Sequence, residues 1–154
     1  MVSIKPIFTA GTFREVEWGD IFVTEQGGVT GFFIRSAHQE PGDQGKITHF
    51  GISLPEDGKS SLIYERDFQN LKCLTSPAWY LQVGDDLDFI VASRTARLEA
   101  GYIQIDGDKM SLIVDNAGRL ASLDLRTGIL MRAMEPGGVY IKKWEVLGGS
   151  ISVF

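Results

Sequence analysis

Turn-forming residues interrupt this sequence at short, fairly regular intervals, and this spacing limits the elements that the chain can form. Glycine alone accounts for 18 of the 154 residues, well above its usual share of about 7%. Glycine adopts positive φ without strain, proline presets φ, and Asp and Asn side chains bond their own backbone, so each cluster of these residues predicts a turn. The clusters are Gly27-Gly28, Pro41-Gly42-Asp43, Pro55-Glu56-Asp57-Gly58, Gly84-Asp85-Asp86, Asp106-Gly107-Asp108, Asp115-Asn116-Ala117-Gly118, Arg126-Thr127-Gly128, Glu135-Pro136-Gly137-Gly138 and Gly148-Gly149. Because turns recur roughly every 8 to 12 residues, only short elements fit between them.

The segments between these turns are rich in β-branched and aromatic residues, which favour strands. Leu87, Phe89 and Val91 face one way, while Asp86 and Asp88 face the other. Such alternation is typical of an antiparallel sheet with one buried face. The predicted strands span residues 21–24, 47–54, 61–65, 87–93, 102–105, 110–114, 120–125, 139–147 and 151–154.

One hairpin can be predicted in full, because alternating segments flank the turn Asp106-Gly107-Asp108. Helical signals are few. Residues 29–37 fit either a short helix or a strand. Residues 71–80 are expected to form a long connection, since Pro77 keeps the residue before it out of the helical region.

This pattern predicts an all-β protein: a β-sandwich, jelly roll or barrel of about ten short, mostly antiparallel strands with at most one short helix. The length fits one domain, residues 1–154. A domain of this size is held together by apolar packing and needs neither a disulfide nor a metal. Hydrophobic residues make up 44% of the chain and charged residues 23%, as in soluble globular domains.

The charge is acidic and evenly spread. Fifteen Lys and Arg oppose twenty Asp and Glu, which gives a net charge of −5, and only Lys142 and Lys143 are adjacent basic residues. Clustered Lys and Arg bind nucleic acids and anionic membranes, so we expect neither as a partner. The first residues lack the basic start and apolar run of a signal peptide, and no stretch reaches the roughly 18 apolar residues of a membrane span. We therefore expect a cytoplasmic protein or a component of a particle assembled there.

Cys73 is the one cysteine, so the chain has neither an intrachain disulfide nor a thiolate cluster for a metal. A cysteine hydrolase needs a thiolate and an imidazole within hydrogen-bond reach. The residue counts permit this reaction, with His38 and His49 as the two histidines. However, a lone cysteine flanked by leucines, here Leu71 and Leu74, is usually a small buried apolar side chain. We therefore assign no catalytic residue, and keep Cys73 with His49 as an alternative.

Two stretches of the sequence resemble the start of a circularly permuted papain-like cysteine hydrolase. In that family a strand that begins with Gly-Asp is followed by a short helix and then by a strand of the type His-apolar-Gly-Ile. The matching residues are Gly19-Asp20-Ile21-Phe22-Val23 and His49-Phe50-Gly51-Ile52. The resemblance implies Cys73 as the nucleophile and His49 as its base. The chain departs from the family because the family's nucleophile lies well beyond the histidine strand, and no cysteine follows Cys73.

Metal and carboxylate chemistry receive little support from spacing. The two histidines, eleven residues apart, form neither an i, i+4 pair nor an i, i+2 pair. The acidic turns around residues 85–88 and 106–108 lack the pattern of a calcium loop. The i, i+2 pairs Glu15 with Glu17 and Asp86 with Asp88 fit the solvent side of a sheet better than a glycosidase site. We expect no metal and no cofactor.

Aromatic residues supply the candidate binding surface. Trp79 and Tyr80 follow Pro77 in the expected connection and are predicted to be partly exposed. Phe154 ends an apolar C-terminal segment that is costly to leave in water, so we expect this segment to pair as a strand, in its own sheet or in that of a neighbour. Trp79, Tyr80 and Phe154 are therefore the predicted binding residues.

These observations predict a non-enzymatic structural or interaction protein that acts through a β-sheet surface. We expect a protein partner or self-association, in a homo-oligomer or in a larger assembly such as a virus or phage particle, by analogy with other β-sandwiches. One alternative is the cysteine hydrolase that uses Cys73 and His49. The other is a carbohydrate or small-ligand binding module built on Trp79, Tyr80 and the acidic turns.

Overall fold

The computed structural model describes residues 8–26, 29–39, 45–55, 59–83, 89–91 and 97–147. These residues form short antiparallel strands in three sheets, and their helical elements are two 3-10 turns. The predicted all-β class is confirmed, with a sandwich- or barrel-like arrangement of the sheets.

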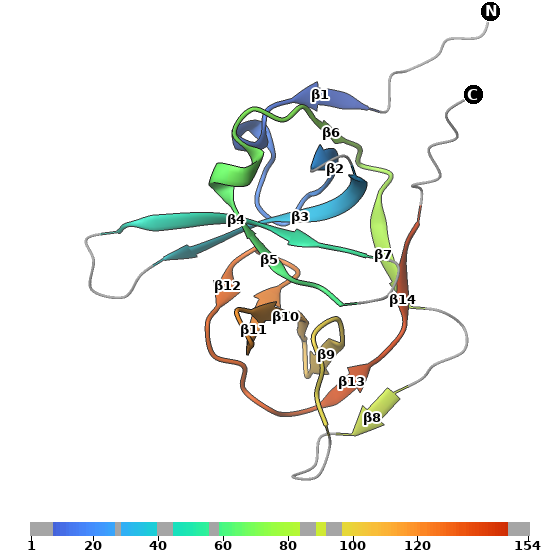
Figure 1. Ribbon diagram of the computed structural model, residues 1–154. Helices are drawn as coiled ribbons and strands as arrows, with labels where there is room; N and C mark the ends of the chain where they lie inside the picture. The colour runs from blue at the N-terminus through green and yellow to red at the C-terminus, as the bar shows by residue number, and fades with distance from the viewer. Residues whose placement is uncertain are drawn as a thin grey trace, which may run out of the picture.

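Sheet A forms the upper layer in Figure 1 and has the strand order β1-β6-β2-β3-β4-β5. Its long central hairpin consists of β2 and β3, which pair from Ile21 with Ile34 to Gln26 with Val29. The strands are β1 (Thr9–Gly11), β2 (Ile21–Gln26), β3 (Val29–Gln39), β4 (Ile47–Ser53), β5 (Leu62–Tyr64) and β6 (Cys73–Thr75).

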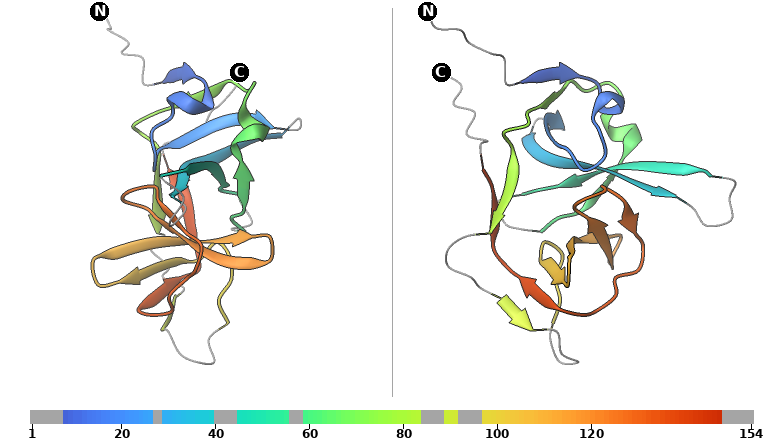
Figure 2. Two further views of the ribbon diagram at one scale, coloured as in Figure 1. Left: turned by 90° about the vertical axis from the view of Figure 1, so that its left-hand side faces the viewer. Right: turned by 180° about the vertical axis from the view of Figure 1, so that it is seen from behind.

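Sheet B forms the lower layer and has the order β12-β11-β10-β9-β13-β8. Its strands are β8 (Phe89–Val91), β9 (Ile103–Asp106), β10 (Lys109–Asn116), β11 (Arg119–Asp124), β12 (Leu130–Met131) and β13 (Val139–Ile141). Sheet C is the two-stranded ribbon of β7 (Tyr80–Val83) and β14 (Trp144–Leu147), which runs along one side of both layers in Figures 1 and 2.

One continuous cluster of buried side chains fills the space between sheets A and B. Strand alternation builds it: Leu112 and Val114 of β10 point inward together and are fully buried. Its members come from the two sheets and from the residues just before β7. They are Ile21, Val23, Ile34, Phe50, Ile52, Leu54, Trp79, Ile103, Leu112, Val114, Ala121, Leu123, Leu130 and Ile141. Burying each large apolar side chain contributes about 1.5–3 kcal/mol, so this cluster holds the two layers together.

Backbone hydrogen bonds also join the two layers. The Ala37 amide on β3 donates to the Gly128 carbonyl at 3.1 Å, and the Asp115 amide on β10 donates to the Ser60 carbonyl at 3.0 Å. Close approach at the first junction requires glycine, because a Cβ at Gly128 would lie 2.3 Å from the Gly19 nitrogen. The layers therefore meet through main chain as well as through the core.

A second apolar cluster, the phenylalanine cluster, covers the outer face of sheet A. The turns η1 (Phe13–Glu15) and η2 (Glu65–Phe68) each place one buried ring over the sheet. The Phe13 and Phe68 rings are stacked with centroids 4.8 Å apart. The cluster consists of Phe13, Val16, Phe22, Phe33, Phe68 and Cys73, with Ile63 and Leu71 packed against it.

The hairpin predicted around Gly107 is confirmed: Asp106 pairs with Lys109, and Gly107 has φ 62°. Residues 29–37, which fitted helix or strand, lie in β3. The long connection predicted for 71–80 is wrong, because residues 73–75 form β6 between β1 and β2. The predicted strand 139–147 is divided between two sheets, and residues 151–154 lie outside the described residues.

Candidate functional site

Cys73, the alternative nucleophile, lies on β6 within the phenylalanine cluster and is 2% exposed. Burial raises the pKa of the Cys73 thiol, while a hydrogen bond with Thr24 and the charge of Arg35 act in the opposite direction to a smaller extent. The thiol is therefore uncharged at neutral pH. A buried, neutral thiol is a poor nucleophile, because thiolate is the reactive form.

His49, the alternative base, lies on β4 and does not reach Cys73 by a hydrogen bond. Its Nδ1 instead accepts a hydrogen bond from Nη2 of Arg35 at 2.9 Å, so the ring proton lies on Nε2. Burial lowers the pKa of His49, and the charge of Arg35 lowers it further. The Trp18 ring lies 6.0 Å from the His49 ring. His49 therefore belongs to a polar cluster around Arg35.

Of the three predicted aromatic binding residues, the structure describes Trp79 and Tyr80, and their exposures differ. Trp79 is 6% exposed and packs against Phe32 in the core, with ring centroids 5.4 Å apart, so the prediction that it is partly exposed is wrong. The reason is alternation at the start of β7, which turns Trp79 inward and leaves Tyr80 54% exposed. Phe154 lies outside the described residues.

An open pocket of about 680 Å³, here called the Arg35 pocket, lies on the outer face of sheet A beside the phenylalanine cluster. The segment around η1, strands β3 and β4, and η2 supply its walls. Its lining residues are Arg14, Glu15, Val16, Glu17, Trp18, Arg35, His49 and Glu65. Of these residues, Glu15, Glu17 and His49 are singled out by the sequence analysis, and Arg35 is not.

Arg35 is the unusual residue of this pocket, because it is a charged side chain that is only 3% exposed. Its guanidinium carbon lies 3.8 Å from the centre of the Phe13 ring, and Nη1 donates to the Phe13 carbonyl at 2.7 Å. Its Nε is buried without a hydrogen-bond partner. Burial lowers the pKa of Arg35, and the negative charge of Glu65 opposes this effect. The sequence contains one indication that Arg35 is unusual, because this single charged residue follows the apolar residues 32–34 within β3.

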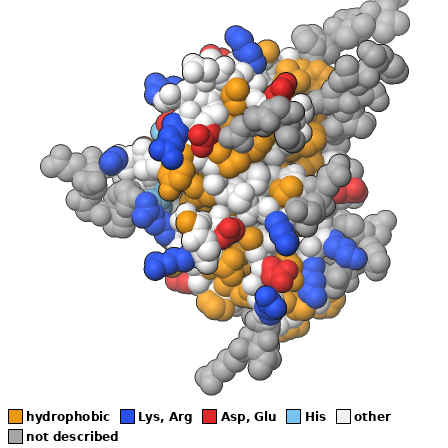
Figure 3. Space-filling model, viewed as in Figure 1, with side chains coloured by type: hydrophobic (Ala, Val, Ile, Leu, Met, Phe, Trp, Pro, Cys, Tyr) orange, Lys and Arg blue, Asp and Glu red, His pale blue; other side chains and the backbone are white. Residues whose placement is uncertain are grey.

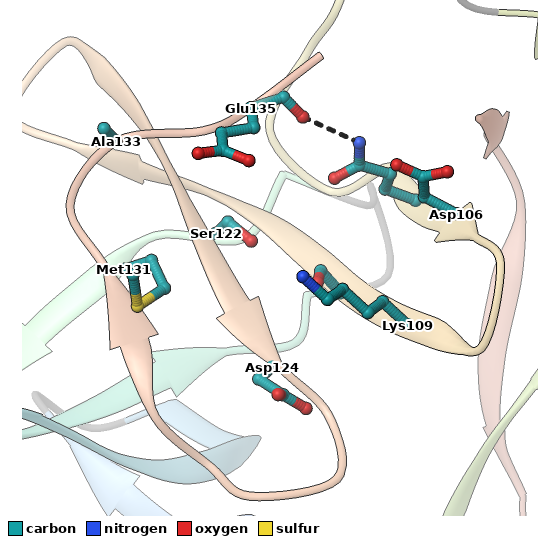
Figure 4. Close-up of a pocket in the computed structure, with 9 residues that line it drawn as sticks. Asp106, Lys109, Ser122, Asp124, Met131, Ala133 and Glu135 are labelled. Atoms are coloured by element: carbon teal, nitrogen blue, oxygen red, sulfur yellow. Dashed lines mark hydrogen bonds between the residues drawn. The ribbon is translucent and has the colours of Figure 1, made fainter. Parts of the chain in front are cut away.

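A second pocket, the sheet B pocket, has a volume of about 300 Å³ and lies on the outer face of sheet B (Figure 4). The segment between β12 and β13 crosses this face and is held by Gln104, whose Nε2 donates to the carbonyls of Glu135 at 2.8 Å and Gly137 at 2.9 Å. The pocket is lined by Gln104, Asp106, Lys109, Ser111, Ser122, Asp124, Met131, Ala133 and Glu135. It is therefore polar and acidic, and none of its lining residues is aromatic.

The third candidate is the β8 edge, formed by Phe89, Ile90 and Val91. β8 pairs with β13 on one side and, among the strands that the structure describes, is the last of sheet B. Phe89 is 52% exposed and Val91 is 64% exposed, and both point to the same face because they are two residues apart.

On the face seen in Figure 3, charged side chains of both signs are interspersed, with apolar surface between them.

The remaining groups that the sequence analysis considered are metal ligands and paired carboxylates. The described parts of the chain contain no group of three or more His, Cys, Asp and Glu side chains placed to hold a metal ion. Glu15 accepts a hydrogen bond from Thr12 at 3.3 Å, and the segment 84–88 with its acidic pair lies outside the described residues. Over the same residues, no helix has the length and hydropathy of a membrane span.

Comparison of the chain with protein-family models, with curated proteins and with solved structures finds no match. The Arg35 pocket, the sheet B pocket and the β8 edge are therefore the features that bear on function.

Proposed function

We propose that this chain is a non-enzymatic interaction protein that associates with a second copy of itself through the β8 edge of sheet B. The observation that carries the proposal is the exposure of two large apolar side chains, Phe89 and Val91, on the last strand of a sheet. Natural proteins usually protect sheet edges by keeping the edge strand very short, or with charged residues, proline or a covering segment. β8 is short, at three residues, but its sequence, Phe-Ile-Val, contains neither charge nor proline.

A second copy fits this edge for reasons of symmetry. An antiparallel pairing of β8 with β8 is a two-fold arrangement that closes on itself, as most homodimers do. With Ile90 at the centre, Phe89 of one copy lies opposite Val91 of the other, and an aromatic–β-branched pair across two strands contributes roughly 0.2–1 kcal/mol. Each copy carries a net charge of −5, so we expect higher salt to strengthen the association by screening repulsion.

The position of the alternative catalytic residues favours binding over hydrolysis. Cys73 is buried in the phenylalanine cluster, and His49 uses Nδ1 to accept from Arg35. A hydrolase mechanism would require both side chains to leave these contacts.

Light scattering after gel filtration, across a tenfold range of protein concentration, tests the proposal. We expect the wild-type mass to rise to twice that of one chain. Val91→Lys places a charge on the edge and should give a monomer at every concentration. Met131→Lys is the matched control, because Met131 is similarly exposed, at 56%, on β12 at the opposite edge of sheet B. A monomeric wild type, or a Val91→Lys protein of unchanged mass, would refute the proposal.

A second candidate function is the binding of a small hydroxyl-rich ligand in the sheet B pocket. Its serines, Gln104 and three carboxylates offer donors and acceptors within a volume of about 300 Å³, near the lower limit for ligand pockets. Ser122→Leu fills this pocket from its floor. If a panel of monosaccharides raises the Tm of the wild type, the same panel should leave the Tm of Ser122→Leu unchanged.

A further inference from the structure

The charge of Arg35 has no direct counter-charge among the described residues. Its two hydrogen bonds go to neutral acceptors, the Phe13 carbonyl and the His49 ring. Glu65, the carboxylate whose charge acts on Arg35, is itself paired with Arg14 at 3.0 Å. Burying a charged group costs free energy unless an opposite charge pairs with it. Arg35 is therefore a buried cation without a paired anion among the described residues.

The guanidinium also has unused donors. It carries five N–H groups, of which the structure assigns one to the Phe13 carbonyl and one to His49. Nε is buried without an acceptor. The planar fork of a guanidinium matches the two oxygens of a carboxylate. Since Arg35 lines an open pocket, a ligand carboxylate would supply both the missing charge and the missing acceptors.

The contacts of Arg35 hold it in place for such a ligand. The guanidinium lies over the Phe13 ring at 3.8 Å, and its two Nη atoms are bonded on different sides, to β4 and to η1. Phe13 in turn is stacked on Phe68. A preorganised donor loses little entropy when it binds, so His49 and Phe13 act as positioning residues.

The other residues of the pocket limit the class of ligand. Two arginines and three glutamates give the lining a formal charge of −1, with His49 neutral. This excess of carboxylates repels a dianion such as phosphate, and it attracts a positive group placed beside the carboxylate. Trp18, which is 41% exposed, adds an aromatic face on the same pocket, and aromatic faces attract ammonium groups.

We propose that the Arg35 pocket binds a small zwitterion of the amino-acid type, with its carboxylate on Arg35 and its ammonium group beside Glu17 and Trp18. This site lies on sheet A, and the β8 edge lies on sheet B, so the two proposals are independent of each other.

NMR titration tests this inference with three probes: glycine, acetate and inorganic phosphate. We expect glycine to shift the Arg35 Nε–Hε signal and the His49 ring signals with a Kd of about 1 mM or tighter. Acetate should bind more weakly, and phosphate should leave these signals unchanged. Arg35→Met keeps the length of the side chain and removes the charge and the donors, so the response to glycine should be lost. Arg126→Met, an exposed arginine between β11 and β12, is the matched control and should respond as the wild type does.

A second measurement keeps the inference testable if Arg35→Met does not fold. In the wild type, a carboxylate on Arg35 offsets the positive charge that lowers the pKa of His49. The midpoint of the His49 titration should therefore move to higher pH when glycine is saturating. The inference is overturned if glycine moves neither set of signals, if the folded Arg35→Met protein binds glycine as the wild type does, or if phosphate binds better than glycine.

Discussion

Gly51 on β4 allows the phenylalanine cluster to close over sheet A, and Gly51→Ala tests how tightly that cluster is packed. A Cβ at Gly51 would lie 2.6 Å from two ring atoms of Phe68. Phe68 cannot easily yield, because it is fully buried and packs against the rings of Phe13, Phe22 and Phe33. We therefore expect the added methyl group to destabilise the folded state.

The magnitude follows from two opposing effects. Adding a methyl group to a well-packed core costs about 1–3 kcal/mol. Alanine also restricts the unfolded chain, which returns about 0.4–1 kcal/mol. Taken at the middle of each range, the two effects leave a net destabilisation of about 1–2 kcal/mol. For a chain of this length, that lowers the Tm by roughly 2–8 °C.

Urea and thermal unfolding, followed by circular dichroism, measure this effect. Gly31→Ala is the matched control on the neighbouring strand, because a Cβ there would meet its nearest atoms at 3.6 Å, an ordinary contact. We expect Gly31→Ala to be neutral or slightly stabilising. In a Phe68→Leu background, Gly51→Ala should cost less than it does in the wild type. A Gly51→Ala protein as stable as the wild type, or an equal cost in both backgrounds, would show that this packing argument is wrong.

Three further predictions follow from single residues. Ala117 has φ 51° in the two-residue turn between β10 and β11, and asparagine tolerates this conformation better than alanine does. Ala117→Asn should therefore raise the free energy of unfolding by up to about 1 kcal/mol. An unchanged urea midpoint would contradict this prediction. Cys73 should react with a thiol reagent only after unfolding, because it is buried, and fast labelling of the native protein would favour the hydrolase alternative. The pKa of His49 is lowered from 6.5 in the folded protein, so the stability that its neutral form provides is lost as the pH falls from 6.5 through the folded-state pKa. His49→Gln should therefore reduce the pH dependence of the urea midpoint in this range. An unchanged pH dependence would contradict the assignment.

Features that depend on neighbouring residues could be predicted from the sequence. Alternation and turn chemistry are local, and they located the β9–β10 hairpin, where Gly107 supplies the positive φ that the turn requires. Most of the predicted strands lie where the structure has strands for the same reason.

Features that depend on distant residues could not be predicted. β6 is a strand because Thr75 pairs with Thr9 and with Phe22, residues far away in the sequence. The segment 139–147 has one continuous strand pattern, but Tyr140 pairs in sheet B and Trp144 in sheet C. The alternation of apolar and polar residues within a strand does not indicate which sheet that strand joins.

The Arg35 pocket shows the same limit at the level of a site. The sequence places a charged residue within the apolar run of β3, but it does not reveal that Phe13, in a separate turn, supplies both the ring beneath the guanidinium and one carbonyl acceptor. Nor does it reveal that His49 is a neighbour, since that contact depends on the register of β3 with β4.

Packing and binding are coupled in this part of the fold. Gly51 is the cross-strand partner of Arg35, and the space beside it is occupied by Phe68, which stacks on Phe13. Phe13 is the residue that positions the guanidinium. A methyl group at Gly51 that displaces Phe68 should therefore displace Phe13 and loosen Arg35. We expect folded Gly51→Ala to bind glycine more weakly than Gly31→Ala in the NMR titration, although neither substitution touches the ligand. If both variants bind glycine equally while Gly51→Ala is the less stable, the phenylalanine cluster stabilises the fold without positioning Arg35.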